Sequence, residues 1–382
     1  MTSPLQPRSR PLAGIRVLDF STLLPGPLAT LILAEAGADV LKVERPEGGD
    51  DMRGFPPAFA DAAGHNFALL NRGKRSLALD LKQPAAVERV RQLACEAHVL
   101  VEQFRPGVMA RLGLGHDELS RLNPRLVYCS ITGYGQAGPM AQVAGHDLNY
   151  LAETGLLMLA AGADGTPPVP PGLIADIGGG ALPAVINILM ALREAERTGR
   201  GRHLDVAMTD GLFAWSFWAQ GEIAAGCGAP KPGSGLLAGG SPRYQVYPTS
   251  DGKFVAAAPL EQKFWQNFCA AIGLDRKLAD DGGDPAATRA AVARIIAGRT
   301  AEHWRQAFAG RDVCCAVART LDEAMCEPHF RDRGLFAAQI VGPRPVPALP
   351  VPLATCYRDA GDAKPFPRLG EHKSWAEEMS QT

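Results

Sequence analysis

The chain has 382 residues, of which 46% are hydrophobic and 21% charged. These values are typical of a globular protein with two domains, or with one large domain that carries an insertion. Lysine and arginine total 39 and aspartate and glutamate 40, so the formal net charge is −1. Because no segment supplies a concentrated basic face, we expect neither nucleic acid nor a membrane as partner, but a small molecule.

The 8 cysteines include no Cys-x-x-Cys pair, so they predict neither a zinc site nor a disulfide framework. We expect buried, reduced thiols and no metal. The N-terminal sequence MTSPLQPRSRPL lacks the apolar core of a signal peptide, and no run approaches the ~18 apolar residues of a membrane span. The sequence therefore predicts a cytoplasmic protein.

The first recognisable unit lies between residues 14 and 50. Residues 15–20 and 40–43 are short, apolar, strand-like runs, and apolar residues repeat at helical spacing between them. This pattern predicts a βαβ unit, whose helix begins near Pro25 and ends at Gly37.

The alternation continues along the next 160 residues or so, as expected for a domain of this kind. Further strands are predicted at 76–81, 99–102, 126–132 and 203–208, and helices at 85–97, 117–122, 181–198 and 211–225. The pattern favours an α/β fold with a Rossmann-like, doubly wound parallel sheet. No Gly-x-Gly-x-x-Gly follows the first strand, and prolines occupy the turn at 23–27, so a dinucleotide cofactor is disfavoured.

Composition divides the chain further. Residues 1–224 form the predicted large domain, and the Gly- and Pro-rich stretch 225–243 is a predicted linker or mobile loop. Residues 244–330 predict a smaller α+β domain that opens with a hairpin around Asp251-Gly252 and continues with helices at 262–272, 285–297 and 301–310. Residues 331–382 are expected to return to the large domain.

Cations stand at several predicted strand ends. Arg45 follows the second strand, Lys74 and Arg75 precede the third, and Arg105 follows the fourth. For each cluster alone, a solvated turn is the better interpretation. Together, the clusters favour a polyphosphate ligand at the carboxyl edge of the sheet.

The stretch from Gly145 to Gly180 carries two proton-active side chains, His146 and Asp176, joined by an irregular segment. Asp147 beside the histidine is a candidate N-cap of a helix at 148–157, and Asp176 a candidate cap of the helix that follows. A carboxylate at a helix start stays ionised and competent as a base, so the capping and catalytic interpretations of Asp176 coexist.

The chain resembles the class III CoA-transferase superfamily of the CaiB/BaiF type, and within it the α-methylacyl-CoA racemases. The resemblance covers nearly the whole length and rests on ordered blocks that include PLAGIRVLDF, NRGKRSLALDLK, FRPGVMARLGL, SITGYGQAGP, GHDLNY and LIADIGGG. It implies an interlocked homodimer whose active site is shared between the large domain of one subunit and the small domain of the other.

The resemblance also implies roles for individual residues. His146 and Asp176 match the acid/base pair of the racemases, and Glu261 matches their small-domain glutamate. Backbone amides near Asp147 would stabilise the enolate oxygen of the thioester. The implied reaction interconverts (R)- and (S)-2-methylacyl-CoA, with coenzyme A as part of the substrate and no separate cofactor. The apolar stretches GLLMLAAG and LLAGG are candidates to line the acyl path, although core packing is an alternative for the first.

A CoA-transferase is the alternative, because transferases of this superfamily use the aspartate that matches Asp176 as a nucleophile. Leu24 stands where the formyl- and oxalyl-type transferases carry a glutamine, which disfavours that branch. Gln103 replaces the usual asparagine of the Glu-Asn-Phe-Arg-Pro motif, and Pro259 and Lys263 flank Glu261 less typically. A non-catalytic CoA-binding protein is a third hypothesis, but binding alone does not require the three acid/base residues.

Overall fold

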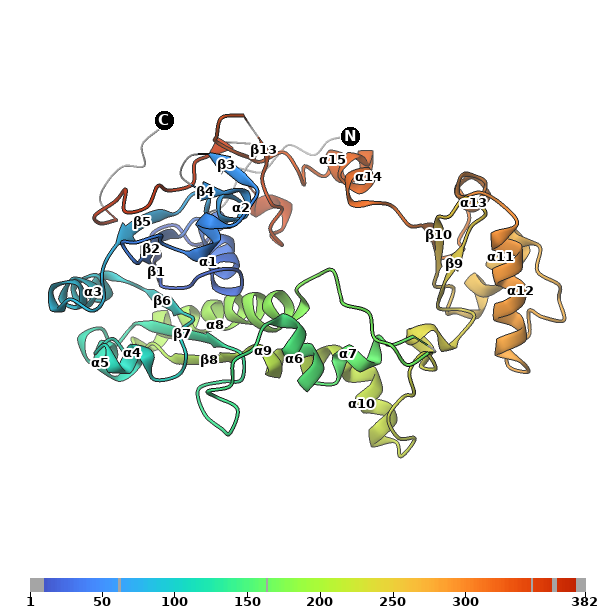
Figure 1. The fold of residues 1–382 in the computed structure, drawn as a ribbon, viewed down its shortest axis with the longest axis horizontal. Helices are drawn as coiled ribbons and strands as arrows, with labels where there is room; N and C mark the ends of the chain where they lie inside the picture. Colours follow the sequence, from blue (N-terminus) through green and yellow to red (C-terminus); the bar gives the residue numbers. More distant parts are fainter. Residues whose placement is uncertain (1–9, 61–62, 163, 345, 359–362, 376–382) are drawn as a thin grey trace. The chain divides into compact units, whose positions relative to one another are not determined.

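A computed structural model describes residues 10–60, 63–162, 164–344, 346–358 and 363–375. The chain forms two compact units (Figure 1). The first comprises residues 1–153, 171–214 and 325–382, and the second residues 154–170 and 215–324. The second unit thus begins before the predicted boundary after residue 224, and it includes a short segment that the sequence assigned to the large domain.

The first unit is built on a six-stranded parallel sheet. Its strands are β1 (Arg16–Asp19), β2 (Asp39–Glu44), β5 (Arg75–Ala78), β6 (Val99–Glu102), β7 (Val127–Thr132) and β8 (His203–Ala207). They lie in the order β5-β2-β1-β6-β7-β8, so the sheet grows outward from β1 in one direction and then from β6 in the other. This is the doubly wound order of Rossmann-like folds, which confirms the predicted fold class.

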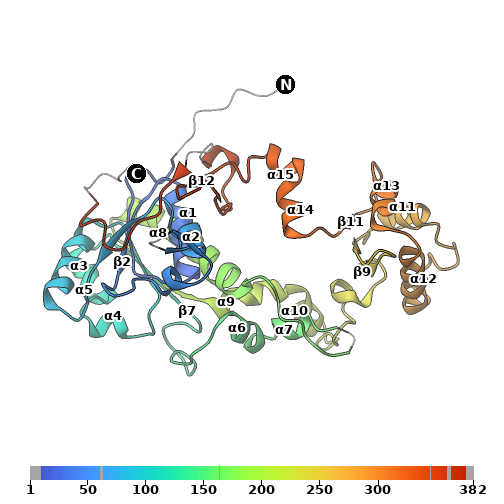
Figure 2. The same cartoon turned by 45° about the horizontal axis from the view of Figure 1, so that its top comes forward.

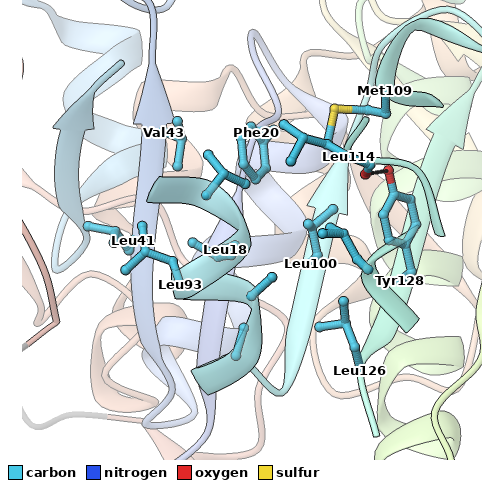
Figure 3. Packing of buried hydrophobic residues seen from close by; sticks show 14 of the residues in the cluster. Leu18, Phe20, Leu41, Val43, Leu93, Leu100, Met109, Leu114, Leu126 and Tyr128 are labelled. Atoms are coloured by element: carbon cyan, nitrogen blue, oxygen red, sulfur yellow. Dashed lines mark hydrogen bonds between the residues drawn. The ribbon is translucent and has the colours of Figure 1, made fainter. Parts of the chain in front are cut away.

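Helices cover both faces of this sheet (Figures 1 and 2). On one face, α3 (Pro84–Glu96), α4 (Val108–Arg111) and α5 (His116–Leu122) pack over the strands, with Leu93 and Met109 against Leu18, Leu41 and other buried residues (Figure 3). On the other face, α1 (Pro25–Glu35) packs against α8 (Leu182–Thr198). Burial on both faces explains why the inner strands carry runs of apolar residues instead of a strict apolar–polar alternation.

Shorter elements complete the first unit. They are η1 (Asp51–Gly54), β3 (Ala58–Ala60), β4 (Ala63–Gly64), α2 (His65–Asn71), α6 (Asp147–Glu153), the π-helical turn η2 (Ala175–Ala181) and α9 (Met208–Leu212). The C-terminal part contributes α15 (Pro328–Asp332), η5 (Thr355–Tyr357) and a small sheet of β12 (Gln339–Ile340), β13 (Val346–Pro347) and β14 (Ala363–Lys364). Ile340 and Ala348 pack against Phe59 and Ala68, so this segment belongs to the core of the first unit.

The second unit is a small α+β body. Its antiparallel sheet has the order β11-β10-β9, formed by β9 (Gln245–Pro248), β10 (Phe254–Ala257) and β11 (Cys315–Val317). The helices α11 (Gln262–Ile272), α12 (Pro285–Ala297) and α13 (Ala301–Phe308) enclose a core around Trp265, Phe268 and Trp304. This unit also contains α7 (Leu156–Leu159), α10 (Phe217–Ala224) and η4 (Leu236–Gly240), and α14 (Leu321–Cys326) follows at its end.

Two predictions about helices need correction. The single helix predicted at 211–225 is instead α9, a 3-10 turn at Phe213–Ser216 (η3) and α10. Gly211 lies so close to Gly179 that a Cβ on it would stand 2.8 Å from the Cα of Gly179, and this backbone contact fixes α9 against η2. The second prediction is that no run approaches the length of a membrane span. Residues Ala175–Thr198 form one helical stretch that is long and apolar enough to cross a bilayer. Half of its most apolar window is buried, as in the core helix of a globular fold.

Candidate active site

A cavity of about 420 Å³ lies at the carboxyl ends of β1, β6 and β7. The strand order reverses between β1 and β6, and a doubly wound sheet binds its ligand at this switch point. The wall is formed by segments that follow these strands, by the start of α6 and by η2; it includes Leu23, Pro25, residues 103–106, residues 131–133, residues 143–146, Asn149, Tyr150, Asp176 and Met208. The cavity is therefore built entirely within the first unit.

His146 and Asp176 line this same cavity. The imidazole of His146 is close enough to affect the carboxyl of Asp176 electrostatically, because it acts to lower the pKa of that group. The two side chains come from different elements, His146 from the residue before α6 and Asp176 from the first turn of η2. The structure thus brings together the two proton-active residues of the central stretch.

Burial raises the pKa of Asp176 from 3.8 to about 6. The negative charge of neighbouring Asp147 adds to this effect, and His146 opposes it. A carboxylate that titrates near the working pH is well matched to proton transfer, because it can both accept and release a proton there. The Asp176 carboxyl can therefore change its protonation state close to neutral pH.

The backbone of His146 is held on both sides. Its N–H donates to the Asn149 side-chain oxygen at 3.0 Å, and its carbonyl accepts the N–H of Asn149 at 2.8 Å and that of Tyr150 at 3.2 Å. The Tyr150 hydroxyl donates to the carbonyl of Gly145 at 2.6 Å. The buried Tyr150 ring fills space that a side chain on Gly133 or Gly145 would occupy, since a Cβ on either would lie within 2.7 Å of the ring.

The predicted helix caps are wrong in detail. Asp147 is the first residue of α6 and not its N-cap, and Asp176 makes no capping hydrogen bond within η2. Instead, the buried Asp147 carboxylate accepts the backbone N–H of Asp176 at 2.9 Å. Asp147 therefore caps η2, a helix distant in sequence.

The turn between β1 and α1 forms another wall, and its geometry was not predicted. Leu23 has a φ of 62°, which is strained for a leucine, and its N–H donates to Asp50 at 3.1 Å. The buried Lys42 ammonium pairs with Asp50 at 3.0 Å and donates to the Ser21 carbonyl. No signal in the sequence marks Leu23, because backbone angles of non-glycine residues leave no local pattern.

Gln103, the residue that departs from the family motif, makes a hydrogen bond to the start of α1. Its side-chain oxygen accepts the N–H of Gly26 at 3.0 Å, and it lines the cavity. Gly26 is required there, since a Cβ would lie 2.1 Å from the Cβ of Ser21. Gln103 thus joins the end of β6 to the start of α1 across the switch point.

Of the four cations expected to bind phosphate, only two follow the carboxyl ends of strands. Arg45 follows β2 and is exposed beside Asp51, with which it pairs. Arg105 follows β6, is exposed, lines the cavity and makes no side-chain hydrogen bond or ion pair within the described part of the chain. A cation in that position is available to a ligand.

Lys74 and Arg75 lie elsewhere. Both are at the amino-terminal end of β5, so the expected convergence on the carboxyl edge is wrong for them. Arg75 pairs with Asp39. The fully buried Lys74 ammonium donates to Asp19, Asn71, Thr30 and the Pro27 carbonyl at 2.8–3.2 Å. A phosphate would reach it only if this network opened.

A second cavity, of about 310 Å³, adjoins the same edge of the sheet. Its lining is largely apolar and includes Phe20, Leu79, Leu81, Phe104 and Leu112, with Arg45 and Lys82 among the charged residues. Phe104 lines both cavities and Arg105 follows it directly. The two cavities are therefore neighbours on either side of the turn that follows β6.

Glu261 belongs to the second unit, so its relation to the cavity stays a prediction. It occupies the N-cap position of α11 without a side-chain capping bond and is exposed. Within the described residues its carboxylate makes no hydrogen bond or ion pair. The described residues also include no group of three or more His, Cys, Asp or Glu side chains arranged to hold a metal ion.

Comparison with known proteins places this fold and site in a family. The family model of CoA-transferase family III matches residues 12–373. The chain is 37% identical to the α-methylacyl-CoA racemase of Mus musculus, over 94% of this chain and 91% of that protein. It is 34% identical to the succinate–glutarate CoA-transferase of Agrobacterium fabrum, over 96% and 95%. The crystal structure of a CaiB/BaiF family protein from Brucella suis matches with a TM-score of 0.79 and 31% identity, over 96% and 97%.

The chain therefore belongs to CoA-transferase family III, which confirms the family resemblance. Relatives that are named as racemases and relatives that are named as transferases both match over almost the whole chain. The protein is an enzyme of this family, and the comparisons leave the choice of reaction to the chemistry of the site.

Proposed function

We propose that this enzyme is an acyl-CoA racemase that interconverts (R)- and (S)-2-methylacyl-CoA thioesters. The observation that carries the proposal is the presence of His146 and Asp176 in the wall of one cavity. Racemisation needs a base on one face of the α-carbon and an acid on the other. A transferase that uses Asp176 as a nucleophile has no need of a histidine opposite it.

In the proposed reaction, the Asp176 carboxylate takes the α-proton from one face of the thioester. The electron pair moves onto the thioester oxygen to give an enolate, and protonated His146 returns a proton to the opposite face. The reverse reaction exchanges the two roles. A histidine suits this task because an imidazole can be neutral or protonated near neutral pH. Backbone N–H groups at the start of α6, near Asp147, are the proposed donors to the enolate oxygen.

Coenzyme A is proposed to lie along the carboxyl edge of the sheet, as part of the substrate and with no further cofactor. The apolar second cavity suits the adenine ring, and Arg45 and Arg105 stand at the strand ends beside it. A guanidinium matches phosphate oxygens well. The thioester would then reach His146 past the Phe104–Pro106 turn, which lines the first cavity.

The acyl group is proposed to be apolar. Within the second unit, the two stretches singled out in the sequence line one cavity of about 200 Å³, where Leu156 and Met158 of α7 and Leu236 of η4 meet Trp215 and Trp218. Glu222 and Lys231 also line this cavity, but most of its lining is apolar and suits a hydrocarbon chain better than a charged dicarboxylate.

We further propose a cytoplasmic homodimer in which Glu261 of the partner subunit completes each active site. The dimer is supported by an apolar stripe on α8: Ile186 and Met190 are 56% and 58% exposed and Leu189 is 43% exposed. These residues share one side of the helix, and a monomer rarely leaves such a stripe uncovered. The double variant Ile186→Asp, Met190→Asp is expected to sediment as a monomer. A sedimentation coefficient equal to that of the parent enzyme would refute a dimer formed through this stripe.

The reaction is tested by hydrogen exchange. In deuterated water, the enzyme is expected to exchange the α-proton of 2-methylacyl-CoA with no added carboxylic acid. His146→Ala is expected to abolish exchange and leave the affinity for CoA nearly intact. If no exchange occurs and CoA instead passes to an added carboxylic acid, the enzyme is a transferase and Asp176 is its nucleophile.

A further inference from the structure

The carboxylate of Asp147, the residue after His146, hydrogen-bonds to the backbone of Asp176. Asp147 is 6% exposed, and its Oδ1 accepts the N–H of Asp176 at 2.9 Å. This hydrogen bond joins the start of α6 to the start of η2, two elements that pack against each other. The bond therefore fixes where η2 begins relative to α6, whose first residue follows His146.

We infer that Asp147 is a positioning residue, whose buried carboxylate holds Asp176 in place and keeps a negative charge beside it. The inference rests on the proposed function for its catalytic consequence. It differs from the role that the family resemblance implied, because there the backbone near Asp147, and not its side chain, acts on the substrate. Here the side chain is already engaged with the protein and points to η2.

The hydrogen bond to Asp147 matters because of how η2 begins. It is π-helical over Ala175–Ala181, and its N-cap residue, Ile174, supplies no side-chain hydrogen bond. The first N–H groups of a helix need partners from outside the helix. Asp147 supplies one, with a charge that a helix N-terminus stabilises. The position of the Asp176 side chain therefore depends on a bond from a neighbouring element.

The charge of Asp147 acts on Asp176 as well. Burial is the main cause that raises the pKa of Asp176 to about 6, and the Asp147 charge is the second. His146, Tyr150 and Arg105 line the same cavity as this carboxyl.

The other elements packed against η2 carry few titratable groups near it. Asp210 of α9 is exposed, and Glu35 at the far end of α1 is paired with Arg72. On β8, Asp205 accepts an N–H from Gln136 and His203 contacts Ser130, while the charged residues of α8 lie in its last turns. Asp147 is thus the close negative charge.

Two variants separate the hydrogen bond from the charge. Asp147→Asn keeps an oxygen that can accept the Asp176 N–H but removes the charge. The pH profile of this variant is measured in the direction in which Asp176 takes the α-proton. Its acid limb is expected to move to lower pH, because a negative charge beside Asp176 is lost. The shift is about half a unit to one unit, because burial of Asp176 remains. Asp147→Ala removes both features. Its kcat for α-proton exchange is expected to fall about 10- to 100-fold, with KM changed by less than about threefold.

Asp210→Asn is the matched control, because it removes an exposed carboxylate from an element that also packs against η2. Its pH profile is expected to match that of the parent enzyme. If the Asp147→Asn profile also matches the parent and Asp147→Ala keeps its kcat, the inference is overturned. Thermal unfolding of each variant shows whether a loss of kcat reflects loss of folded enzyme.

A direct titration keeps this test independent of the proposed reaction. The carboxyl carbon of Asp176 is followed by NMR in enzyme labelled with carbon-13 at aspartate, and Asp176→Asn identifies its signal. In Asp147→Asn, the midpoint is expected to fall by the same half to one unit. An unchanged midpoint would refute the role of the charge even in an enzyme that catalyses no exchange. Absence of exchange with a shifted midpoint would refute the racemase proposal alone.

Discussion

Two cations that the sequence alone treats alike should respond to mutation in opposite ways. Lys74→Met removes a fully buried ammonium from Asp19 and three other oxygen acceptors. Removal of one partner of a buried ion pair costs about 3–5 kcal/mol, because the remaining charge is left without its partner. Lys42 is near enough to lower the pKa of Asp19 too, so we expect the lower end of this range. Arg105→Met, by contrast, removes an exposed guanidinium that has no partner among the described residues. The free energy of unfolding should therefore change by less than about 0.5 kcal/mol.

The affinity for coenzyme A should show the reverse pattern. A charge-assisted hydrogen bond to a phosphate contributes about 1.5–3 kcal/mol, so Arg105→Met should raise the Kd for CoA about 10- to 100-fold. Folded Lys74→Met should bind CoA with a Kd within about twofold of the parent. Urea unfolding and isothermal titration calorimetry with CoA measure the two quantities. The reasoning is refuted if Lys74→Met unfolds like the parent but binds CoA at least tenfold more weakly.

Two further changes test how the walls of the cavity are held. Tyr150→Phe deletes the hydroxyl that donates a 2.6 Å hydrogen bond. It should cost about 1 kcal/mol of stability and lower kcat about tenfold, whereas Tyr134→Phe, which removes the hydroxyl of the neighbouring ring, should do neither. Gly179→Ala would place a Cβ 2.1 Å from the Met208 carbonyl oxygen and should destabilise the protein by at least about 1–3 kcal/mol in urea unfolding. Gly221→Ala in α10 meets open space and should cost nothing; equal losses in the two glycine variants would contradict the packing argument.

The parallel sheet could be predicted because its strands are buried on both faces. Runs such as Val127–Thr132 are mostly apolar and are buried along their whole length. Segments with helical periodicity separate them, which leaves few alternatives to a doubly wound fold. The division of the predicted helix 211–225 into α9, η3 and α10 could not be predicted. Gly211 packs against Gly179, and a contact between distant segments has no local pattern. The return of the C-terminal segment to the large domain was expected from the sequence, but its packing beside Phe59 and Ala68 has no local pattern.

At the site, the chemistry was visible in the sequence but the supports were not. The pair His146 and Asp176 stood out by residue type, and each was placed in the cavity wall by an element that the sequence indicated. The sequence favours an exposed position for Lys74, because a cation beside a glycine is typical of a solvated turn. The structure shows that Lys74 is buried. The sequence predicts that Asp147 caps its own helix, because sequence rules assign a cap to the nearest helix. Only the fold brings the start of η2 within hydrogen-bond distance of Asp147.

The structure also bears on how one family can include proteins named as racemases and proteins named as transferases. A nucleophile must be ionised, whereas an acid/base group must change its protonation state during turnover. Burial and the charge of Asp147 raise the pKa of Asp176 to about 6, which favours exchange of a proton near neutral pH. An imidazole in the same wall supplies the second proton carrier. Replacement of His146 would remove the carrier and also the one neighbour that lowers the pKa of Asp176, so a lineage that lost the histidine would need another donor or cation to keep its aspartate ionised. Under the proposed racemase reaction, the residue at position 146 therefore decides whether Asp176 exchanges protons or acts as a nucleophile.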